Sequence, residues 1–304
     1  MLLAAGRGER MEPLSSLVAK PALEVLGSPL LASSLENLRR AGCAEIVVNL
    51  HRHPEQVEAA ARNASGGKVR FSREPALLGG AGGVAAARPL LGEGPVLVGN
   101  ADIWGTLDLT AVVSARDEGV ATLGVLPHPD PARWSSVVLD SGGRVREFLR
   151  PGANGDGERF LFTGFQLLGR EVVAALPSPP CEMSTVWNTL RQVGRLLGAV
   201  VEGEWREAGT PFAYRELVVG SLAGTAWVHP DAIVEDGSSV VRSAVGAGCR
   251  VAAGAEITGC VVTAGARVDA GSNLRDCVIA GPVCLSHETI IGTLVVPGRR
   301  VPLR

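Results

Sequence analysis

The sequence has few lysines, few aromatic residues and no excess of charge. Only two of its 29 basic residues are lysines, Lys20 and Lys68, and Phe, Trp and Tyr contribute 6, 5 and 1 of the 304 residues. The 31 acidic residues nearly balance the basic ones, leaving a formal net charge of −2. Because nucleic acids and anionic membrane surfaces attract strongly basic chains, we expect neither as a partner.

Long hydrophobic runs and paired cysteine motifs are also missing. The apolar stretches end well before the ~20 residues that a membrane span needs, and the first residues lack the charged region of a signal peptide. Six cysteines without a Cys-x-x-Cys pair argue against a disulfide framework or a zinc site. With 46% hydrophobic residues the chain can bury a core, and we expect a soluble, cytoplasmic protein.

Residues 1–222 alternate short aliphatic runs with amphipathic stretches. The aliphatic runs at 44–50, 95–99 and 121–126 indicate buried strands, and the amphipathic stretches at 29–41 and 54–62 indicate helices. Strands that alternate with helices form parallel sheets covered by helices. This part therefore predicts an α/β domain with a Rossmann-like, mostly parallel sheet.

A 17-residue repeat replaces the helical pattern in residues 225–304. Aliphatic residues recur in steps of six, six and five, as expected when each coil of a three-sided solenoid buries one residue per side. Gly237, Gly254 and Gly271 share the period, and Ser243, Cys260 and Cys277 are predicted to stack as structural residues. The three aliphatic rows are Val228, Val245, Val262, Ile279 and Val296; Val234, Val251, Val268 and Leu285; and Val240, Ile257, Leu274 and Ile291.

The repeat resembles the hexapeptide repeat of left-handed parallel β-helices, here with about four coils. A short solenoid has open ends and exposed coil faces, which tend to be capped or paired. We therefore expect the β-helix to make the protein a homo-oligomer.

The first strand runs into a glycine-rich turn, Leu3-Ala-Ala-Gly6-Arg-Gly8-Glu-Arg10. A strand followed by such a turn leaves backbone N–H groups available for phosphate oxygens. The turn is neither a P-loop nor a dinucleotide fingerprint. Taken alone, Arg10 could be a solvated loop arginine and Lys20 a surface lysine.

Positions 3–21 reproduce the pattern L-A-A-G-x-G-x-R-(L/M)-x-P-L-T-x4-K-P, with Ser15 in place of Thr. At these residues the chain resembles the sugar-1-phosphate nucleotidyltransferases, and within them the mannose-1-phosphate guanylyltransferase-like branch. The resemblance covers nearly the whole chain. Further matching segments are Leu78–Gly82 (L-G-T-A-G in the family, with Gly80 for Thr), Val98–Ile103 (N-G-D, with Ala101 for Gly), Phe162–Phe165 (F-T-G-I) and Trp205–Pro211 (W-x-D-x-G-T-P).

The resemblance implies transfer of a nucleotidyl group from an NTP to a sugar 1-phosphate, giving an NDP-sugar and pyrophosphate. It implies Mg²⁺ as cofactor, and GTP with mannose 1-phosphate or a related hexose phosphate as substrates. Arg10, Lys20 and Asp102 would be catalytic, Arg10 and Lys20 by contacting the phosphates. Asp102 also follows an apolar strand, where ligands of open α/β sheets bind; the alternative is an N-cap or turn aspartate. The implied contacts are Leu3, Ala4, Gly6, Gly8, Glu74, Gly79, Gly80 and Gly82 for the nucleotide, Arg150 and Gly164 for the sugar phosphate, and Asp102 and Glu207 for Mg²⁺.

Two further positions depart from the family pattern. Glu207 stands in place of a metal-binding Asp, and Arg150 in place of the Lys of E-K-P. These departures keep open a weak or inactive regulatory or scaffold homologue that binds nucleotide sugar. A third alternative is acyl transfer by the β-helix, for which His229 and His287 are the candidate bases.

Overall fold

The computed structural model describes residues 1–115 and 117–303, which form two compact units. The first unit, called here the sheet unit, contains Met1–Gly6 and Leu31–Trp205. The second, called the solenoid unit, contains Arg7–Leu30 and Arg206–Arg304. The glycine-rich turn is therefore divided, because its first half belongs to the sheet unit and its second half to the solenoid unit.

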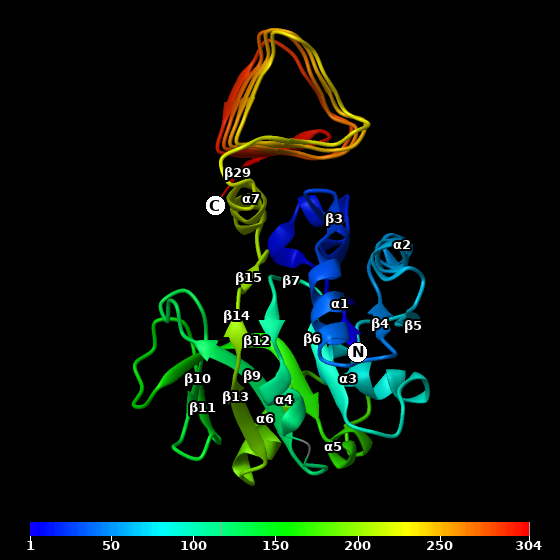
Figure 1. The fold of residues 1–304 in the computed structure, drawn as a ribbon, viewed down its shortest axis with the longest axis vertical. Coiled ribbons are helices and arrows are strands. Elements are labelled where there is room, and N and C mark those ends of the chain that lie inside the picture. Colours follow the sequence, from blue (N-terminus) through cyan, green and yellow to red (C-terminus); the bar gives the residue numbers. More distant parts are fainter. Residues whose placement is uncertain (116, 304) are drawn as a thin grey trace. The chain divides into compact units, whose positions relative to one another are not determined.

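The sheet unit is built on a nine-stranded sheet with the path β11-β10-β12-β6-β1-β4-β5, and β9 pairs with β12 and β13 (Figure 1). Strands β6, β1, β4 and β5 run parallel to one another, whereas β12 is antiparallel to β6. The strands are β1 (Leu2–Leu3), β4 (Val47–Leu50), β5 (Arg70–Arg73), β6 (Val96–Asn100), β9 (Ala121–Pro127), β10 (Ser136–Leu139), β11 (Val145–Leu149), β12 (Arg159–Leu168) and β13 (Leu196–Val200), with short pieces β7 (Ile103–Trp104), β8 (Leu107–Asp108) and β14 (Glu202–Gly203).

Helices cover this sheet because its strands are apolar on both sides, as the buried run Val96–Gly99 illustrates. One core joins alternate residues of β6 and β9 to α3, α5 and α6, and α1 and α4 pack against β6 and β9. The helices are α1 (Leu31–Arg40), α2 (Pro54–Ser65), α3 (Gly79–Ala87), α4 (Thr110–Ser114), α5 (Arg170–Ala174) and α6 (Met183–Gln192). The α/β fold predicted for this part is confirmed.

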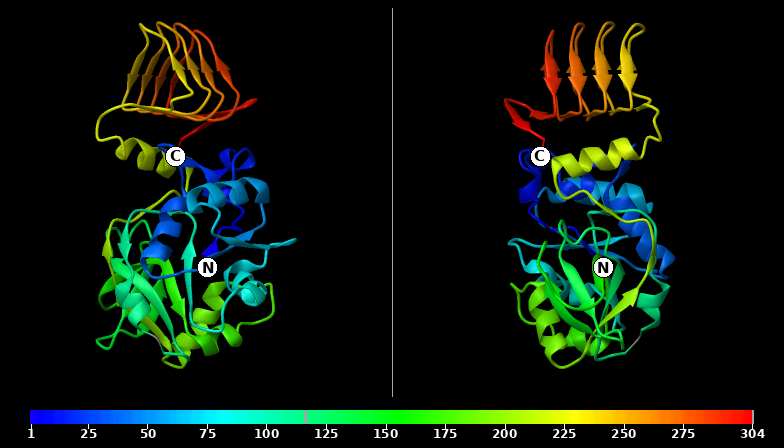
Figure 2. Two further views of the ribbon diagram at one scale, coloured as in Figure 1. Left: turned by 45° about the vertical axis from the view of Figure 1, so that its right-hand side comes forward. Right: turned by 90° about the vertical axis from the view of Figure 1, so that its left-hand side faces the viewer.

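The solenoid unit contains stacked coils of triangular cross-section (Figures 1 and 2). Three parallel sheets form its sides, and β29 (Arg299–Pro302) closes one of them in antiparallel pairing with β28. Their strands are β16 (Trp227–Val228), β19 (Ala244–Val245), β22 (Val261–Val262), β25 (Val278–Ile279) and β28 (Thr293–Val296); β17 (Ile233–Val234), β20 (Arg250–Val251), β23 (Arg267–Val268) and β26 (Cys284–Leu285); and β18 (Ser239–Val241), β21 (Glu256–Thr258), β24 (Asn273–Arg275) and β27 (Thr289–Ile291).

The predicted stacking of small residues is confirmed. Ser243, Cys260 and Cys277 are fully buried. The Cys260 N–H donates to Ser243 Oγ at 3.0 Å, and the Cys277 N–H donates to Cys260 Sγ at 3.3 Å. These residues form a ladder inside the solenoid.

The predicted inward rows are wrong in the last coil. Leu274 pairs with Ile290 rather than Ile291, and Ile279 pairs with Val295 rather than Val296. Ile290 is 6% exposed and Ile291 is 61% exposed. The last coil is one residue shorter than the 17-residue repeat, and a shift by one residue exchanges the two faces of a strand. The adjacent aliphatic pair at 290–291 concealed the shift.

The rest of the solenoid unit precedes the coils or comes from the N-terminal segment. It comprises β15 (Arg206–Glu207), α7 (Pro211–Gly220), the hairpin of β2 (Glu24–Val25) and β3 (Ser28–Pro29), and three 3₁₀ turns, Glu9–Met11, Leu14–Ser16 and Lys20–Ala22. Thr210 caps α7 by accepting the Ala213 N–H at 3.1 Å, and Pro211 occupies its first turn.

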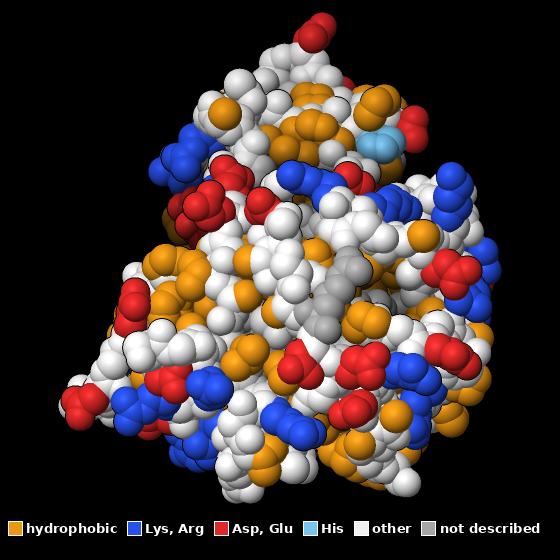
Figure 3. Space-filling view, turned by 60° about the horizontal axis from the view of Figure 1, so that its bottom comes forward, with side chains coloured by type: hydrophobic (Ala, Val, Ile, Leu, Met, Phe, Trp, Pro, Cys, Tyr) orange, Lys and Arg blue, Asp and Glu red, His pale blue; other side chains and the backbone are white. Residues whose placement is uncertain are grey.

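The surface shown in Figure 3 carries acidic and basic side chains interspersed, as the near-zero net charge predicts. None of the described helices has the length and apolar character needed to cross a membrane.

Candidate functional site

Several predicted site residues lie at one edge of the central sheet. Leu2 pairs with Val48 and Gly99, and Leu3 pairs with Asn100, so β1, β4 and β6 end together. The Ala101 N–H donates to the Leu3 carbonyl at 3.0 Å. The structure thus brings Leu3 and the half-buried Asp102 to the carboxyl edge of the parallel strands, which is the ligand-binding edge of open α/β sheets.

A buried hydrogen-bond chain fixes the backbone at this edge. The Ala4 N–H donates to Asn49 Oδ1 at 2.6 Å, and Asn49 Nδ2 donates to Glu74 Oε1 at 2.7 Å. The other carboxylate oxygen of Glu74 accepts the Leu78 N–H at 3.2 Å. Glu74 is only 4% exposed, so its carboxylate holds the segments around Ala4 and Leu78 in place. Its predicted contact with nucleotide stays a prediction.

Asn49 was not among the residues singled out from the sequence. It is 3% exposed and lies within the apolar strand β4. A polar side chain inside such a run was the available signal, because buried amides need hydrogen-bond partners. Its two bonds, to the Ala4 N–H and to Glu74, give it a positioning role.

The glycines at the start of α3 allow a close approach of the chain to itself. A Cβ on Gly79, whose φ is +75°, would lie 2.5 Å from the Cys181 carbonyl oxygen. The Gly82 N–H donates to that same oxygen at 2.9 Å, and the Cys181 N–H donates to the Leu78 carbonyl at 2.8 Å. Backbone packing therefore requires glycine at 79. Binding of nucleotide by Gly79, Gly80 and Gly82 stays a prediction.

Gly164 lies beside Asn100 and Ile103, which precede and follow Asp102 in the chain, whereas Arg150 lies elsewhere on the sheet. Gly164 has a φ of +87°. A Cβ added to it would lie 2.9 Å from Ile103 Cγ1 and 3.3 Å from Asn100 Cβ. Arg150 follows β11 at an exposed turn, and β10 and β12 separate β11 from β6. The sugar-phosphate roles of both residues stay predictions.

Gly6 belongs to the sheet unit, whereas Gly8, Arg10, Lys20 and Glu207 belong to the solenoid unit. Arg10 Nη2 lies 2.9 Å from Glu207 Oε1, with the two side chains 68% and 18% exposed. Gly8 adopts the left-handed conformation, and its carbonyl accepts the Ser15 hydroxyl at 2.9 Å. A Cβ on Gly8 would lie 3.9 Å from Lys20 Cβ. The turn carrying Arg10 thus folds back beside Lys20.

The residues predicted to bind Mg²⁺ belong to different units, Asp102 to the sheet unit and Glu207 to the solenoid unit. Among residues 1–115 and 117–303, no three His, Cys, Asp or Glu side chains are grouped so that they could hold a metal ion. A site made of one or two carboxylates completed by substrate phosphates is the usual arrangement for Mg²⁺. The donor types fit this metal, and the shared site stays a prediction.

Two family models match the chain. Residues 1–218 match the nucleotidyl transferase family, and residues 215–296 match the GlmU-like C-terminal hexapeptide family. The first match covers well over half of the chain, which therefore belongs to the nucleotidyl transferase family. Its catalytic class is sugar-1-phosphate nucleotidyltransferase.

Individual relatives act on different nucleotides. The chain is 36% identical over 239 residues to N-acetylmuramate alpha-1-phosphate uridylyltransferase of Neisseria meningitidis, covering 75% of this chain and 98% of the relative. It is 27% identical over 276 residues to mannose-1-phosphate guanylyltransferase of Mycobacterium tuberculosis, covering 84% and 76%. HddC from Yersinia pseudotuberculosis has the same fold, with a TM-score of 0.61 and 21% identity over 72% of this chain and 97% of that chain. The recognition of the family from the sequence is confirmed.

Proposed function

We propose that the chain transfers a uridylyl group from UTP to a hexose 1-phosphate of the N-acetylmuramate class. The observation that supports the activity is the shared carboxyl edge of β1 and β6, where Leu3 pairs with Asn100 and Gly164 approaches Asn100 and Ile103, the residues around Asp102. The choice of donor and acceptor is supported by the uridylyltransferase relative, whose length is covered almost completely at 36% identity.

In the proposed reaction, an oxygen of the sugar phosphate attacks the α-phosphorus of the nucleotide. A new P–O bond forms, the bond to the β-phosphate oxygen breaks, and pyrophosphate leaves. Both partners are highly anionic, so catalysis requires positioning and cationic stabilisation. Arg10 would bind the leaving pyrophosphate and Lys20 the nucleotide phosphates, with Arg10 offering a planar fork and Lys20 a compact charge.

Asp102 and Glu207 would hold the cofactor by their carboxylates. Mg²⁺, when bound, neutralises charge on the phosphate oxygens. Glu207 is paired with Arg10, so Arg10 must leave it, or share it, when Arg10 binds pyrophosphate.

Guanylyl transfer to mannose 1-phosphate is the second candidate. The match to the guanylyltransferase relative covers 84% of this chain, against 75% for the uridylyltransferase relative. The longer match, over 276 residues, supports the donor and acceptor expected from the sequence.

Release of pyrophosphate from four NTPs, each combined with several hexose 1-phosphates and Mg²⁺, tests the proposal. UTP with N-acetylmuramate 1-phosphate should give the highest kcat/KM. A maximum with GTP and mannose 1-phosphate would select the second candidate. Nucleotide-sugar binding without release for any pair would indicate the inactive regulatory or scaffold homologue.

A further inference from the structure

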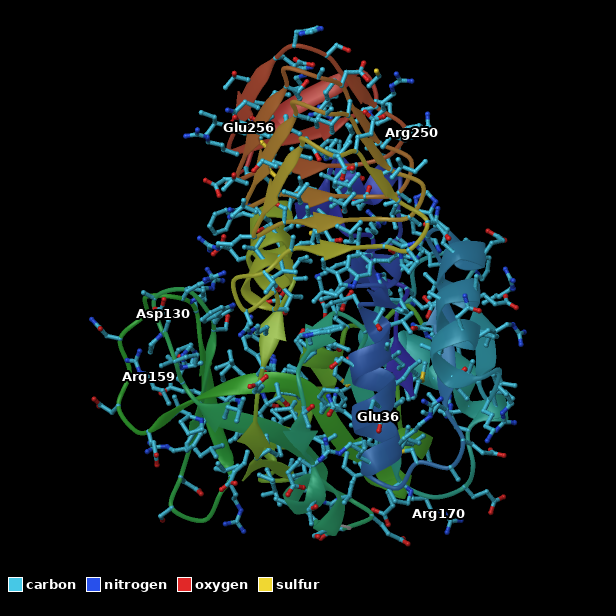
Figure 4. The ribbon with its side chains drawn as sticks, turned by 45° about the horizontal axis from the view of Figure 1, so that its top comes forward. Glu36, Asp130, Arg159, Arg170, Arg250 and Glu256 are labelled. Carbon is cyan, nitrogen blue, oxygen red and sulfur yellow. The ribbon has the colours of Figure 1, made fainter. Side chains whose placement is uncertain are left out.

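One side of the solenoid is apolar on its outer surface. In each of β19, β22, β25 and β28, one residue points into the solenoid and its neighbour points outward. The outward-facing neighbours are also buried, with at most 4% of their surface exposed. On the other two sides the outer rows carry charged residues such as Arg250 and Glu256, which project from the surface (Figure 4). The apolar outer row consists of Ala244, Val261, Val278 and Leu294.

Helix α7 packs against this side, on β22. Arg215 of α7 donates from Nε to the Gly259 carbonyl at 2.7 Å and forms an ion pair with Asp276. Its side chain is 9% exposed. Gly259 and Asp276 lie at the same corner of successive coils, with φ of +63° and +53°. A nearly buried guanidinium therefore joins α7 to one corner of the solenoid.

The N-terminal segment 7–30 packs against both α7 and the coils. The hydroxyl of the fully buried Tyr214 in α7 donates to the Glu24 carbonyl at 2.6 Å. A Cβ on Gly27 would lie 3.0 Å from the Trp227 ring, and a Cβ on Gly281 would lie 3.4 Å from Leu17 Cδ1. Residues 7–30 thus rest on α7 and on the first and later coils.

The same segment carries the two cations assigned to phosphate binding. The 3₁₀ turn containing Lys20 lies between Leu17 and Glu24, which contact the coils and α7. Arg10 is held by Glu207, three residues before the Thr210 cap of α7. Arg10 and Lys20 therefore lie on a segment that contacts α7, and Arg215 of α7 contacts the solenoid corner at Asp276.

We propose that the β-helix is the platform that positions the phosphate-binding cations, and that the Arg215–Asp276 pair is its positioning contact. The inference rests on the proposed function, because it takes Arg10 and Lys20 as ligands of the NTP. Asp276 is itself 59% exposed, and Arg215 also pairs with Glu216, its neighbour within α7. Removing the Asp276 charge leaves the guanidinium paired with its own helix, so the charged link between α7 and the solenoid corner is lost and α7 is held there less firmly. Loosening α7 raises the conformational cost of placing Arg10 and Lys20 on the phosphates.

Asp276→Asn tests the contact in the full chain, since asparagine has the same shape and tolerates the left-handed conformation. Arg242→Asn is the matched control, because Arg242 is exposed and occupies a left-handed corner of another coil, with a φ of +44°. We expect D276N to weaken binding of UTP with Mg²⁺ about tenfold by calorimetry. Hydrogen exchange of amides 11–25 should accelerate in D276N, and R242N should change neither quantity.

A double-mutant cycle with Arg10→Ala distinguishes positioning from general destabilisation. If Asp276 acts through Arg10 and Lys20, D276N should cost less in the R10A protein than in the wild type. Full additivity of the two losses would overturn the inference. If D276N binds UTP like the wild type while R10A binds it weakly, the inference fails and the proposed function stands. If R10A binds UTP like the wild type, the role given to Arg10 fails, and the inference with it.

Arg215→Lys provides a second measurement that does not depend on D276N folding. Lysine retains a charge for Asp276 but lacks the planar fork that also reaches the Gly259 carbonyl. We expect R215K to have a UTP affinity, and an exchange rate of amides 11–25, between those of the wild type and D276N. Wild-type values for both measurements would overturn the inference.

Discussion

Arg10 and Glu207 lie 197 positions apart in the sequence and form an ion pair with Nη2 and Oε1 separated by 2.9 Å. The residue proposed to bind pyrophosphate is thus paired with the residue proposed to bind Mg²⁺. Gly209 fits against both, since a Cβ there would lie 2.8 Å from Glu207 Oε1 and 3.2 Å from Arg10 Nη1. Any larger residue at position 209 would displace one of the two paired side chains.

Removing the charge of Glu207 should impair catalysis, whereas shortening its side chain should not. We expect Glu207→Gln to lower kcat by about 100-fold through loss of charge stabilisation. Glu207→Asp restores the residue of the family pattern and should keep or raise turnover. The measurement is pyrophosphate release as a function of Mg²⁺ concentration. Wild-type turnover in E207Q would contradict the metal role of Glu207.

Asp102→Asn should affect activity far more than stability. Loss of the carboxylate should raise the activation barrier by about 3 kcal/mol or more, because Asp102 is the predicted metal ligand at the end of β6. The melting temperature should shift by no more than about 2 °C. A large drop in melting temperature with little loss of kcat would instead identify Asp102 as a structural turn residue.

Glu74 should matter for stability. Glu74→Gln replaces a carboxylate oxygen by an amide NH₂ that faces the Asn49 Nδ2 or Leu78 N–H donor. We expect a loss of about 1–3 kcal/mol in the free energy of unfolding, the cost of a buried unsatisfied donor. Glu36→Gln on the exposed surface of α1 is the control and should change it by less than about 0.5 kcal/mol. Denaturant unfolding measures the free energy of unfolding of both variants. Equal values for E74Q and E36Q would refute the structural role of Glu74.

The register of the last coil can be tested with two neighbouring isoleucines. Ile290→Ser should destabilise the solenoid by about 2–4 kcal/mol, because Ile290 is buried in its core. Ile291→Ser should be nearly neutral, because its side chain is 61% exposed. Chemical unfolding of the two variants measures both losses of stability. A larger loss in I291S than in I290S would show that Ile291 faces inward and that the 17-residue repeat continues through the last coil.

The expected homo-oligomer is open to a direct measurement. Light scattering on the full chain should give a mass that is a multiple of 31.4 kDa. Ile233 and Val241 are each 46% exposed on the outside of the first coil. Replacing both by Asp should lower the mass if subunits meet there. A wild-type mass of one chain would refute the oligomer.

Much of the fold follows from local pattern. The apolar run at 95–99 became β6, and the amphipathic stretch at 54–62 became the core of α2. The inward rows hold through Leu285, even where the inward residue has an aliphatic neighbour, as at Val261–Val262. They fail at Ile291 and Val296, because in both places an aliphatic residue one position earlier can take the inward place. The choice depends on coil length, which only stacking reveals.

The site was less predictable because its supports are distant in sequence. The motif predicts that Gly79 contacts nucleotide, and the structure adds a second requirement for glycine, because a Cβ there would collide with the Cys181 carbonyl. Asn49 and Arg215 carry no motif, and their positioning roles arise from partners 25 and 61 residues away. The packing of residues 7–30 on the solenoid likewise depends on tertiary contacts that no local pattern encodes.

Phosphorus NMR of one reaction mixture shows whether the protein transfers a nucleotidyl group. With UTP, N-acetylmuramate 1-phosphate and Mg²⁺, UDP-sugar and pyrophosphate should appear in equal amounts. Neither should form when Mg²⁺ is chelated or when Asp102→Asn replaces the wild type. If no NTP reacted with any sugar phosphate, that result would contradict nucleotidyl transfer. Release of pyrophosphate with UMP and no nucleotide sugar would contradict it as well.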